Sequence, residues 1–231
     1  MPTDVATTYG EFYRQRNPEH VYPVEFVVRA YLGSYPRLPR TEQPLAGARV
    51  LDLGCGDGRN MALLSNLGMA VFGVEIAPDI CAATTERLRH LGVTVDVRVG
   101  RNRAIPFEDR FFDHVLACHS CYYVDPQSRF DDNVAEIARV MKPGARWVLS
   151  APIATSYIFQ GAVDLGAGHM EIRMDPYGVR NGSVLKKFDD EREIESTLGR
   201  WFTDFHIGSC RNDFWGIEEH VWTVVCRRRN E

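Results

Sequence analysis

The residues with the clearest chemistry form a glycine-rich block at positions 50–58, which reads Val-Leu-Asp-Leu-Gly-Cys-Gly-Asp-Gly. An apolar stretch runs directly into Gly54 and Gly56, and a helical pattern follows. Glycines at such a turn let the chain bend tightly and let a ligand approach the backbone. Asp52 stands two residues before the first of these glycines, and a carboxylate there suits a ligand that carries an amine. The block predicts a small-molecule site between a strand and a helix.

A second acidic residue, Glu75, ends the next apolar stretch, about twenty residues after the glycine turn. A carboxylate at that place can accept hydrogen bonds from both hydroxyls of a ribose. The same layout could serve a nicotinamide dinucleotide, but the third glycine of a dinucleotide turn would fall on Arg59. Arg59 therefore disfavours an oxidoreductase, which stays open as the alternative from another enzyme class.

The elements that must position these residues follow an alternating order. Apolar stretches predict strands at 49–53, 70–75, 93–99, 112–118 and 146–150, with helices at 60–67, 78–91 and 129–141 between them. A helix at 189–198 and strands at 202–207 and 220–226 close the chain. Short apolar strands that alternate with helices predict a mostly parallel sheet with helices on both faces, which is a doubly wound α/β fold.

Two segments stand outside this alternation. Residues 1–47 contain helical patterns at 9–16 and 24–32, and we expect them to form a helical cap with Tyr9 and Tyr13 over the site. Residues 152–187 are long, mixed and glycine-bearing, and a structureless loop of that length is unusual. We therefore expect a lid or insertion there, within a main domain that spans residues 48–231.

Taken as a set, these blocks resemble the class I S-adenosylmethionine-dependent methyltransferases over roughly residues 48–151. Residues 52–58 are similar to the family's first motif, residues 102–107 to its adenine loop, and residues 138–148 to its next helix, turn and strand. The resemblance implies a seven-stranded sheet in the order 3-2-1-4-5-7-6, with strand seven antiparallel. It also implies methyl transfer from S-adenosylmethionine to O or N of a small molecule. The cofactor contacts that it implies are Asp52, Gly54, Cys55, Gly56, Glu75, Ile76, Asn102 and Cys118.

One position departs from the family pattern. Many members carry an aspartate just after the third strand, near the adenine amino group, whereas this chain reads Gly100-Arg101-Asn102. The amide of Asn102 can still form a hydrogen bond with adenine.

The stretch after the fourth expected strand is the candidate acceptor side. His119 is the candidate general base because an ordinary imidazole titrates near neutrality. Tyr122, Tyr123 and His169 are the candidate wall of the acceptor pocket. Cys118 and Cys121 have the spacing of a metal or redox pair, but no second pair of ligands stands at a fitting spacing, so we expect no metal. A non-catalytic module that binds S-adenosylmethionine and an aminopropyl transferase also remain as alternatives.

Composition narrows the partners. The 231 residues carry a net charge of −4, so we expect no nucleic-acid partner. No apolar run is long enough for a membrane helix and no signal peptide is visible, so we expect no membrane partner. The six cysteines are scattered, which indicates buried thiols in the reducing cytoplasm. The sequence does not indicate the acceptor or the oligomeric state.

Overall fold

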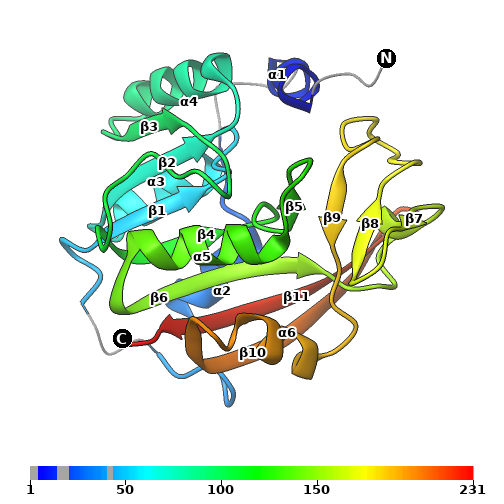
Figure 1. The fold of residues 1–231 in the computed structure, drawn as a ribbon. Coiled ribbons are helices and arrows are strands. Elements are labelled where there is room, and N and C mark those ends of the chain that lie inside the picture. The colour runs from blue at the N-terminus through cyan, green and yellow to red at the C-terminus, as the bar shows by residue number, and fades with distance from the viewer. Residues whose placement is uncertain (1–4, 15–20, 41–43, 231) are drawn as a thin grey trace.

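A seven-stranded sheet forms the centre of the computed structural model, which describes residues 5–14, 21–40 and 44–230 (Figure 1). In spatial order its strands are β10 (Phe202–Phe214), β11 (Ile217–Arg228), β6 (Met141–Pro152), β4 (Phe112–Ala117), β1 (Arg49–Leu53), β2 (Ala70–Glu75) and β3 (Asp96–Val99). The strands from β6 to β3 pair in parallel, while β11 is antiparallel to both of its neighbours. With β11 as the seventh strand of the family and β10 as the sixth, the predicted order 3-2-1-4-5-7-6 is confirmed.

Helices cover both faces of the sheet, as the alternating pattern predicted. They are α1 (Val5–Arg14), α2 (Glu25–Leu32), α3 (Arg59–Asn66), α4 (Pro78–His90), α5 (Phe130–Val140) and α6 (Glu191–Leu198). One apolar core joins the sheet to α5 and α6, and a second joins it to α2, α3 and α4. Successive side chains of a strand point to opposite faces, so Val50 enters the second core while Leu51 enters the first.

Several strand limits differ from the prediction. The third strand begins at Asp96 instead of residue 93. The expected turn at 142–145 lies inside β6, where the pairing register shifts and Gly144 has a φ of +72°, so the strand continues past the irregularity. The two closing strands are much longer than expected, because β10 and β11 pair from Phe202 to Phe214. Their pairing with each other extends both strands into residues whose local pattern alone indicates a loop.

Residues 152–187 hold a short 3-10 helix, η1 (Tyr157–Phe159), and most of a second sheet. That sheet has the order β5 (Tyr123–Val124), β9 (Val184–Lys186), β8 (His169–Glu171) and β7 (Val163–Asp164), all antiparallel. Because β5 belongs to the segment that follows β4, this small sheet stands at the carboxyl end of the parallel strands (Figure 1).

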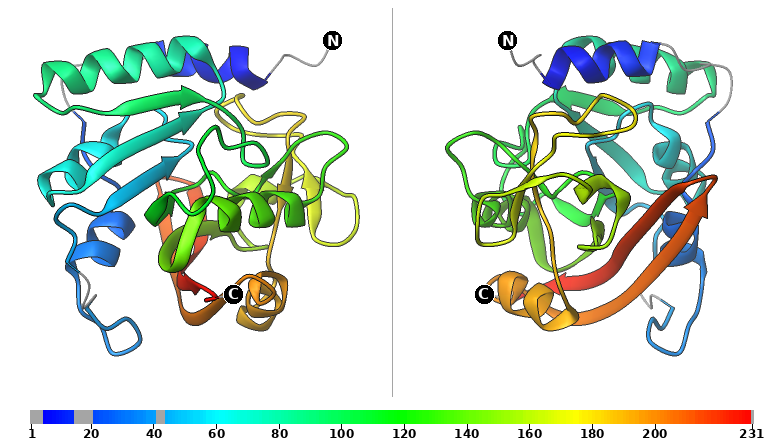
Figure 2. Two further views of the ribbon diagram at one scale, coloured as in Figure 1. Left: turned by 60° about the vertical axis from the view of Figure 1, so that its left-hand side comes forward. Right: turned by 90° about the vertical axis from the view of Figure 1, so that its right-hand side faces the viewer.

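The first helix lies beside α4, at the same end of the molecule (Figure 2). A Cβ built on Gly10 would come within 2.7 Å of the Asp79 carboxylate, so the absence of a side chain allows this close approach. The helix starts at Val5 and ends at Arg14, and the end predicted at residue 16 lies outside the described residues. Within the described ranges, no helix has the length and hydropathy that crossing a bilayer requires.

Candidate functional site

A cavity of about 350 Å³ opens at the carboxyl ends of β1, β2 and β4. This is the edge at which ligands bind in open α/β sheets. Most of the residues that the sequence singled out line it, namely Gly54, Cys55, Glu75, Ile76, Asn102, Cys118, His119, Tyr122 and Tyr123. Segments far apart in the chain therefore meet here, as the predicted topology requires.

The glycine turn and Glu75 form one rigid corner of the cavity. The Glu75 carboxylate accepts hydrogen bonds from the backbone N–H groups of Gly56 at 3.0 Å and Ile76 at 2.7 Å. Burial raises the pKa of Glu75, and these two donors partly oppose the rise. Each oxygen therefore accepts one bond and keeps a lone pair for a ligand hydroxyl. The structure thus places Glu75 beside the glycine turn with acceptor capacity left on both carboxylate oxygens.

Gly54 allows the loop after β4 to approach the turn closely. Its φ is +70°, and a Cβ at this position would come within 2.5 Å of Ser120 Cβ. The Ser120 hydroxyl donates a hydrogen bond to the carbonyl oxygen of Leu53, which holds the two loops together. Any side chain at Gly54 would separate them.

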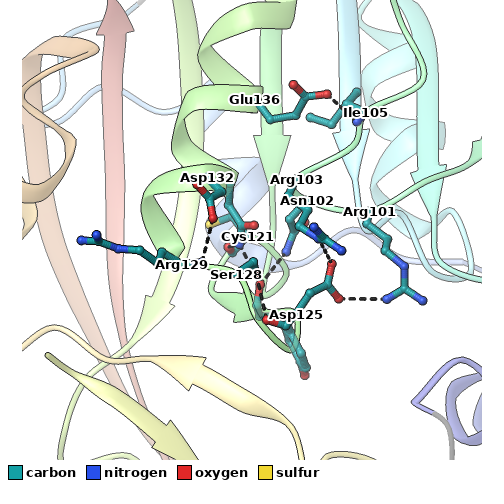
Figure 3. A network of polar contacts seen from close by, with 12 residues as sticks. Arg101, Asn102, Arg103, Ile105, Cys121, Asp125, Ser128, Arg129, Asp132 and Glu136 are labelled. Carbon is teal, nitrogen blue, oxygen red and sulfur yellow. Dashed lines mark hydrogen bonds and ion pairs between the residues drawn. The ribbon is translucent and has the colours of Figure 1, made fainter. Parts of the chain in front are cut away.

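Asn102 lies on the cavity wall, in the loop that follows β3 (Figure 3). Its amide nitrogen donates to the carbonyl oxygens of Ser120 at 2.9 Å and Tyr123 at 3.2 Å. The amide oxygen is left to accept from an adenine amino group. Asp125 holds the same loop by pairing with Arg101 at 2.9 Å and Arg103 at 3.0 Å. Farther along this stretch, Ile105 and Phe107 enter the apolar core.

Asp52 and Gly56 are not on the cavity wall. Along β1, Leu53 faces the cavity, so alternation turns Asp52 toward the opposite face of the sheet. The Asp52 carboxylate is fully buried, and neither oxygen has a hydrogen-bond partner among the described residues. Burial raises its pKa to about 7, although Arg59 lowers it. Asp52 therefore lies behind the glycine turn and does not line the cavity, contrary to the direct ligand contact that the sequence predicted.

His119 follows β4 with a left-handed backbone, at a φ of +57°. Its backbone N–H donates to the Ser150 hydroxyl at 2.9 Å, which fixes this conformation. The ring lines the cavity, and burial, together with the positive charges of Arg59 and Arg180, lowers its pKa to about 4. His119 is therefore a neutral imidazole at physiological pH, and a much weaker base than the sequence indicated.

Three segments meet at the cavity around Tyr123. The hydroxyls of Tyr9 and Tyr123 share a hydrogen bond of 2.5 Å, which joins α1 to the loop after β4. Arg180, from the loop before β9, donates from Nε to the Tyr123 hydroxyl at 3.1 Å and from Nη1 to Asp175 at 3.1 Å. This chain of contacts links the N-terminal helix to residues 152–187 across the cavity. We call it the Tyr9–Tyr123–Arg180 bridge.

His169 lies elsewhere. It belongs to β8 and lines a separate, smaller hollow together with Lys186 and Glu193. The strand alternation and its contact with the carbonyl oxygen of Gly166 at 3.3 Å turn the ring away from the main cavity. The structure thus does not bring His169 to the acceptor pocket, which corrects the expectation from the sequence.

The cavity contains residues that the sequence did not indicate, chiefly Arg59, Ser120, Arg180 and Glu219. Arg180 follows a turn at Gly178 within the segment of least regular pattern, and Glu219 lies near the start of β11, one residue before the strand that the sequence predicted at 220–226. Neither has a spacing typical of a motif. Only the fold brings them to the cavity.

Cys118 and Cys121 are buried, free thiols. Burial raises the pKa of both Cys118 and Cys121 to about 12, which disfavours the thiolate that metal binding and redox exchange need. In the part of the chain that the structure describes, no three or more His, Cys, Asp or Glu side chains form a group that could hold a metal ion.

Comparisons with known proteins agree with this architecture. A family model described as a methyltransferase domain matches residues 51–149. The ubiquinone biosynthesis O-methyltransferase of Xylella fastidiosa is 31% identical over 181 residues, which cover 78% of this chain and 68% of the relative. A sterol 4-C-methyltransferase of Caenorhabditis elegans is 32% identical over 153 residues, covering 65% of this chain. The chain spans only 43% of that relative's length.

A solved S-adenosylmethionine-dependent methyltransferase from Methanosarcina mazei has the same fold, with a TM-score of 0.66 at 20% identity. The match covers 86% of this chain and 99% of that one. The resemblance seen in the glycine block is therefore confirmed by sequence and by fold. The two curated relatives are named for different acceptor atoms, oxygen and carbon, so their names do not define the acceptor here. The chain belongs to the S-adenosylmethionine-dependent methyltransferases, and S-adenosylmethionine is its cofactor.

Proposed function

We propose that the cavity over the glycine turn holds S-adenosylmethionine and directs its methyl group to O or N of a small molecule. The observation that carries this proposal is the meeting of Gly54, Glu75 and Cys118 on one wall, at the ends of three adjacent parallel strands. Glu75 binds the ribose hydroxyls, and Ile76 and Asn102 flank the adenine. When bound, the cofactor supplies a methyl group on a sulfonium centre.

The residues of the chain orient the acceptor and exclude water. Tyr122, Tyr123 and Tyr157 line the end of the cavity beyond Cys118, and we assign them to the acceptor pocket. Burial raises the pKa of Tyr122, and raises that of Tyr157 to about 12, so both remain neutral phenols. His169 is not part of this assignment. Alignment of the acceptor in a closed site is the main contribution expected from the protein.

We further propose that residues 1–47 act as a cap and residues 152–187 as a lid on the main domain. The Tyr9–Tyr123–Arg180 bridge supports this, because it joins both segments over the cavity. A cytoplasmic location and the absence of a nucleic-acid partner remain proposals from composition. The six cysteines are all free, which fits a reducing compartment.

The test is thermal unfolding of the protein with S-adenosylmethionine, S-adenosylhomocysteine, NAD or NADP. A ligand at 100 times its Kd adds about 2.7 kcal/mol of stability, which is a shift of roughly 5–10 °C for a chain of this size. We expect the shift only with the two sulfur ligands, its loss in Glu75→Ala, and its retention in Glu108→Ala, which alters an exposed carboxylate. A shift with a nicotinamide nucleotide alone would reject the proposal.

Ligand binding alone would also be found in a non-catalytic module. Release of S-adenosylhomocysteine in the presence of candidate acceptors separates the enzyme from such a module. We expect release with at least one small hydroxyl or amine compound.

A further inference from the structure

Arg180 and Glu219 are charged side chains of the cavity wall that have no part in the cofactor assignment above. Arg180 comes from the loop before β9, and Glu219 comes from β11. They lie on segments that join the site only in the folded chain. Each side chain has hydrogen-bonding atoms that find no partner within the described residues.

Arg180 is held by two of its three guanidinium nitrogens. Nε donates to the Tyr123 hydroxyl and Nη1 donates to the Asp175 carboxylate. Asp175 is fixed in turn, because its Oδ2 accepts from the backbone N–H groups of Val179 at 3.0 Å and Arg180 at 2.9 Å. Nη2 of Arg180 donates no hydrogen bond within the described residues. A rigidly held guanidinium group whose Nη2 remains free to donate suits an anionic oxygen.

Glu219 has the opposite character. Its side chain is partly buried at the cavity wall and has no hydrogen-bond or salt-bridge partner in residues 5–14, 21–40 and 44–230. Burial raises its pKa, while Arg180 and Arg59 lower it. Both guanidinium groups thus act on Glu219 through space without contacting it. The gap is open to a ligand, and a free carboxylate there suits an N–H or O–H donor.

The wall beside these two groups is aromatic and uncharged. Tyr122 and Tyr157 line it, and the Tyr122 and Tyr123 rings stack with centroids 5.1 Å apart. Flat aromatic surfaces pack well against another ring. The cavity therefore combines a cationic donor, an anionic acceptor and an apolar wall.

We propose that the methyl acceptor is a small aromatic acid whose carboxylate binds Nη2 of Arg180 and whose hydroxyl or amino group donates to Glu219. This inference rests on the proposed function and defines the class of its substrate. Arg180 sets the preference for an anion. Glu219 sets the preference for a protic group and holds that group in the cavity.

The experiment measures binding to protein saturated with S-adenosylhomocysteine, by calorimetry. The probes are 3- and 4-hydroxybenzoate, 3- and 4-aminobenzoate, their methyl esters, and benzoate. We expect at least one hydroxybenzoate or aminobenzoate to bind tenfold or more tightly than its own methyl ester and than benzoate. The reason is that hydrogen bonds to charged groups are stronger than those between neutral groups. This comparison needs no variant, so it holds even if a substitution prevents folding.

Variants then assign each preference to its residue. Arg180→Met should remove the preference for acid over ester, and Glu219→Gln should remove most of the preference over benzoate. The matched controls Arg173→Met and Glu218→Gln alter neighbouring side chains outside the cavity and should keep both preferences.

The outcomes separate this inference from the proposed function. If S-adenosylhomocysteine itself does not bind, the proposed function fails. If it binds, but no acid binds or the esters bind as tightly as the acids, only the substrate class is overturned. Retention of both preferences in Arg180→Met and Glu219→Gln would overturn the assignment to these residues.

Discussion

Asp52 gives the sharpest quantitative prediction, because its carboxylate is buried without a partner in the described part of the chain. Burial raises its pKa from 3.8 to about 7, despite the opposing effect of Arg59. A carboxyl whose folded pKa lies above its unfolded value contributes stability that is fully present below the unfolded pKa. That stability is lost as the pH rises through the folded pKa.

The size of the loss follows from the two pKa values. Over the whole window, from pH 3.8 to pH 7, the difference in pKa corresponds to about 4 kcal/mol of unfolding free energy. Between pH 5 and pH 8, the unfolding free energy lost through ionisation of Asp52 is about 3 kcal/mol. Asp52→Asn keeps the size and polarity of the side chain but cannot ionise. We therefore expect the variant to gain about 3 kcal/mol relative to the wild type over that range.

The measurement is denaturant unfolding of both proteins at pH 5, 6, 7 and 8 without ligand. Titrating groups far from Asp52 contribute equally to both proteins and cancel in the difference. The cost of burying the amide is the same at every pH, so it cancels in the change of that difference from pH 5 to pH 8. The corresponding difference in Tm is about 6–12 °C for a chain of this size. A free-energy difference between the two proteins that stays constant from pH 5 to pH 8 would refute the reasoning.

Two further predictions concern the loops around the cavity. Gly54→Ala should cost about 2–4 kcal/mol of stability, because it combines a positive φ with a Cβ against Ser120, whereas Gly47→Ala shares the positive φ in open space and should cost about 1 kcal/mol. Chemical denaturation measures both, and equal losses would show that the contact has no effect. Tyr123→Phe removes the centre of the Tyr9–Tyr123–Arg180 bridge and should raise amide hydrogen exchange in α1 about tenfold, while Tyr35→Phe should not. Unchanged exchange in α1 would mean that the bridge does not hold the cap.

Local pattern was sufficient for the central architecture. Two strands could be predicted from a few neighbouring residues each, because their apolar stretches end at Leu53 and Glu75. The turn between them could be predicted from its glycines. Strands and helices could be predicted because their periodicities of 2 and 3.6 residues and their turn glycines are short-range features. The strand order could then be predicted because connections in such sheets follow simple topological rules. The same residues, read together, also indicated the family and the cofactor.

The local sequence pattern did not predict where side chains point or which distant residues they contact. Asp52 lies behind the turn because alternation along β1 gives the cavity to Leu53. His169 faces a different hollow because β8 pairs within the second sheet. The low pKa of His119 depends on burial and on two distant arginines, so no local sequence feature reports it.

The sequence by itself determined the doubly wound sheet, the glycine turn, the position of Glu75 and the family, since each depends on spacing along the chain. Only the tertiary structure decided which side chains line the end of the cavity that we assign to the acceptor. Arg180 and Glu219 belong to segments without a motif, and they reach the cavity through the pairing of β9 with β8 and of β11 with β6. Contacts between residues far apart in the chain depend on the whole packed arrangement, which is why the residues that we propose to select the acceptor could not be predicted from their spacing.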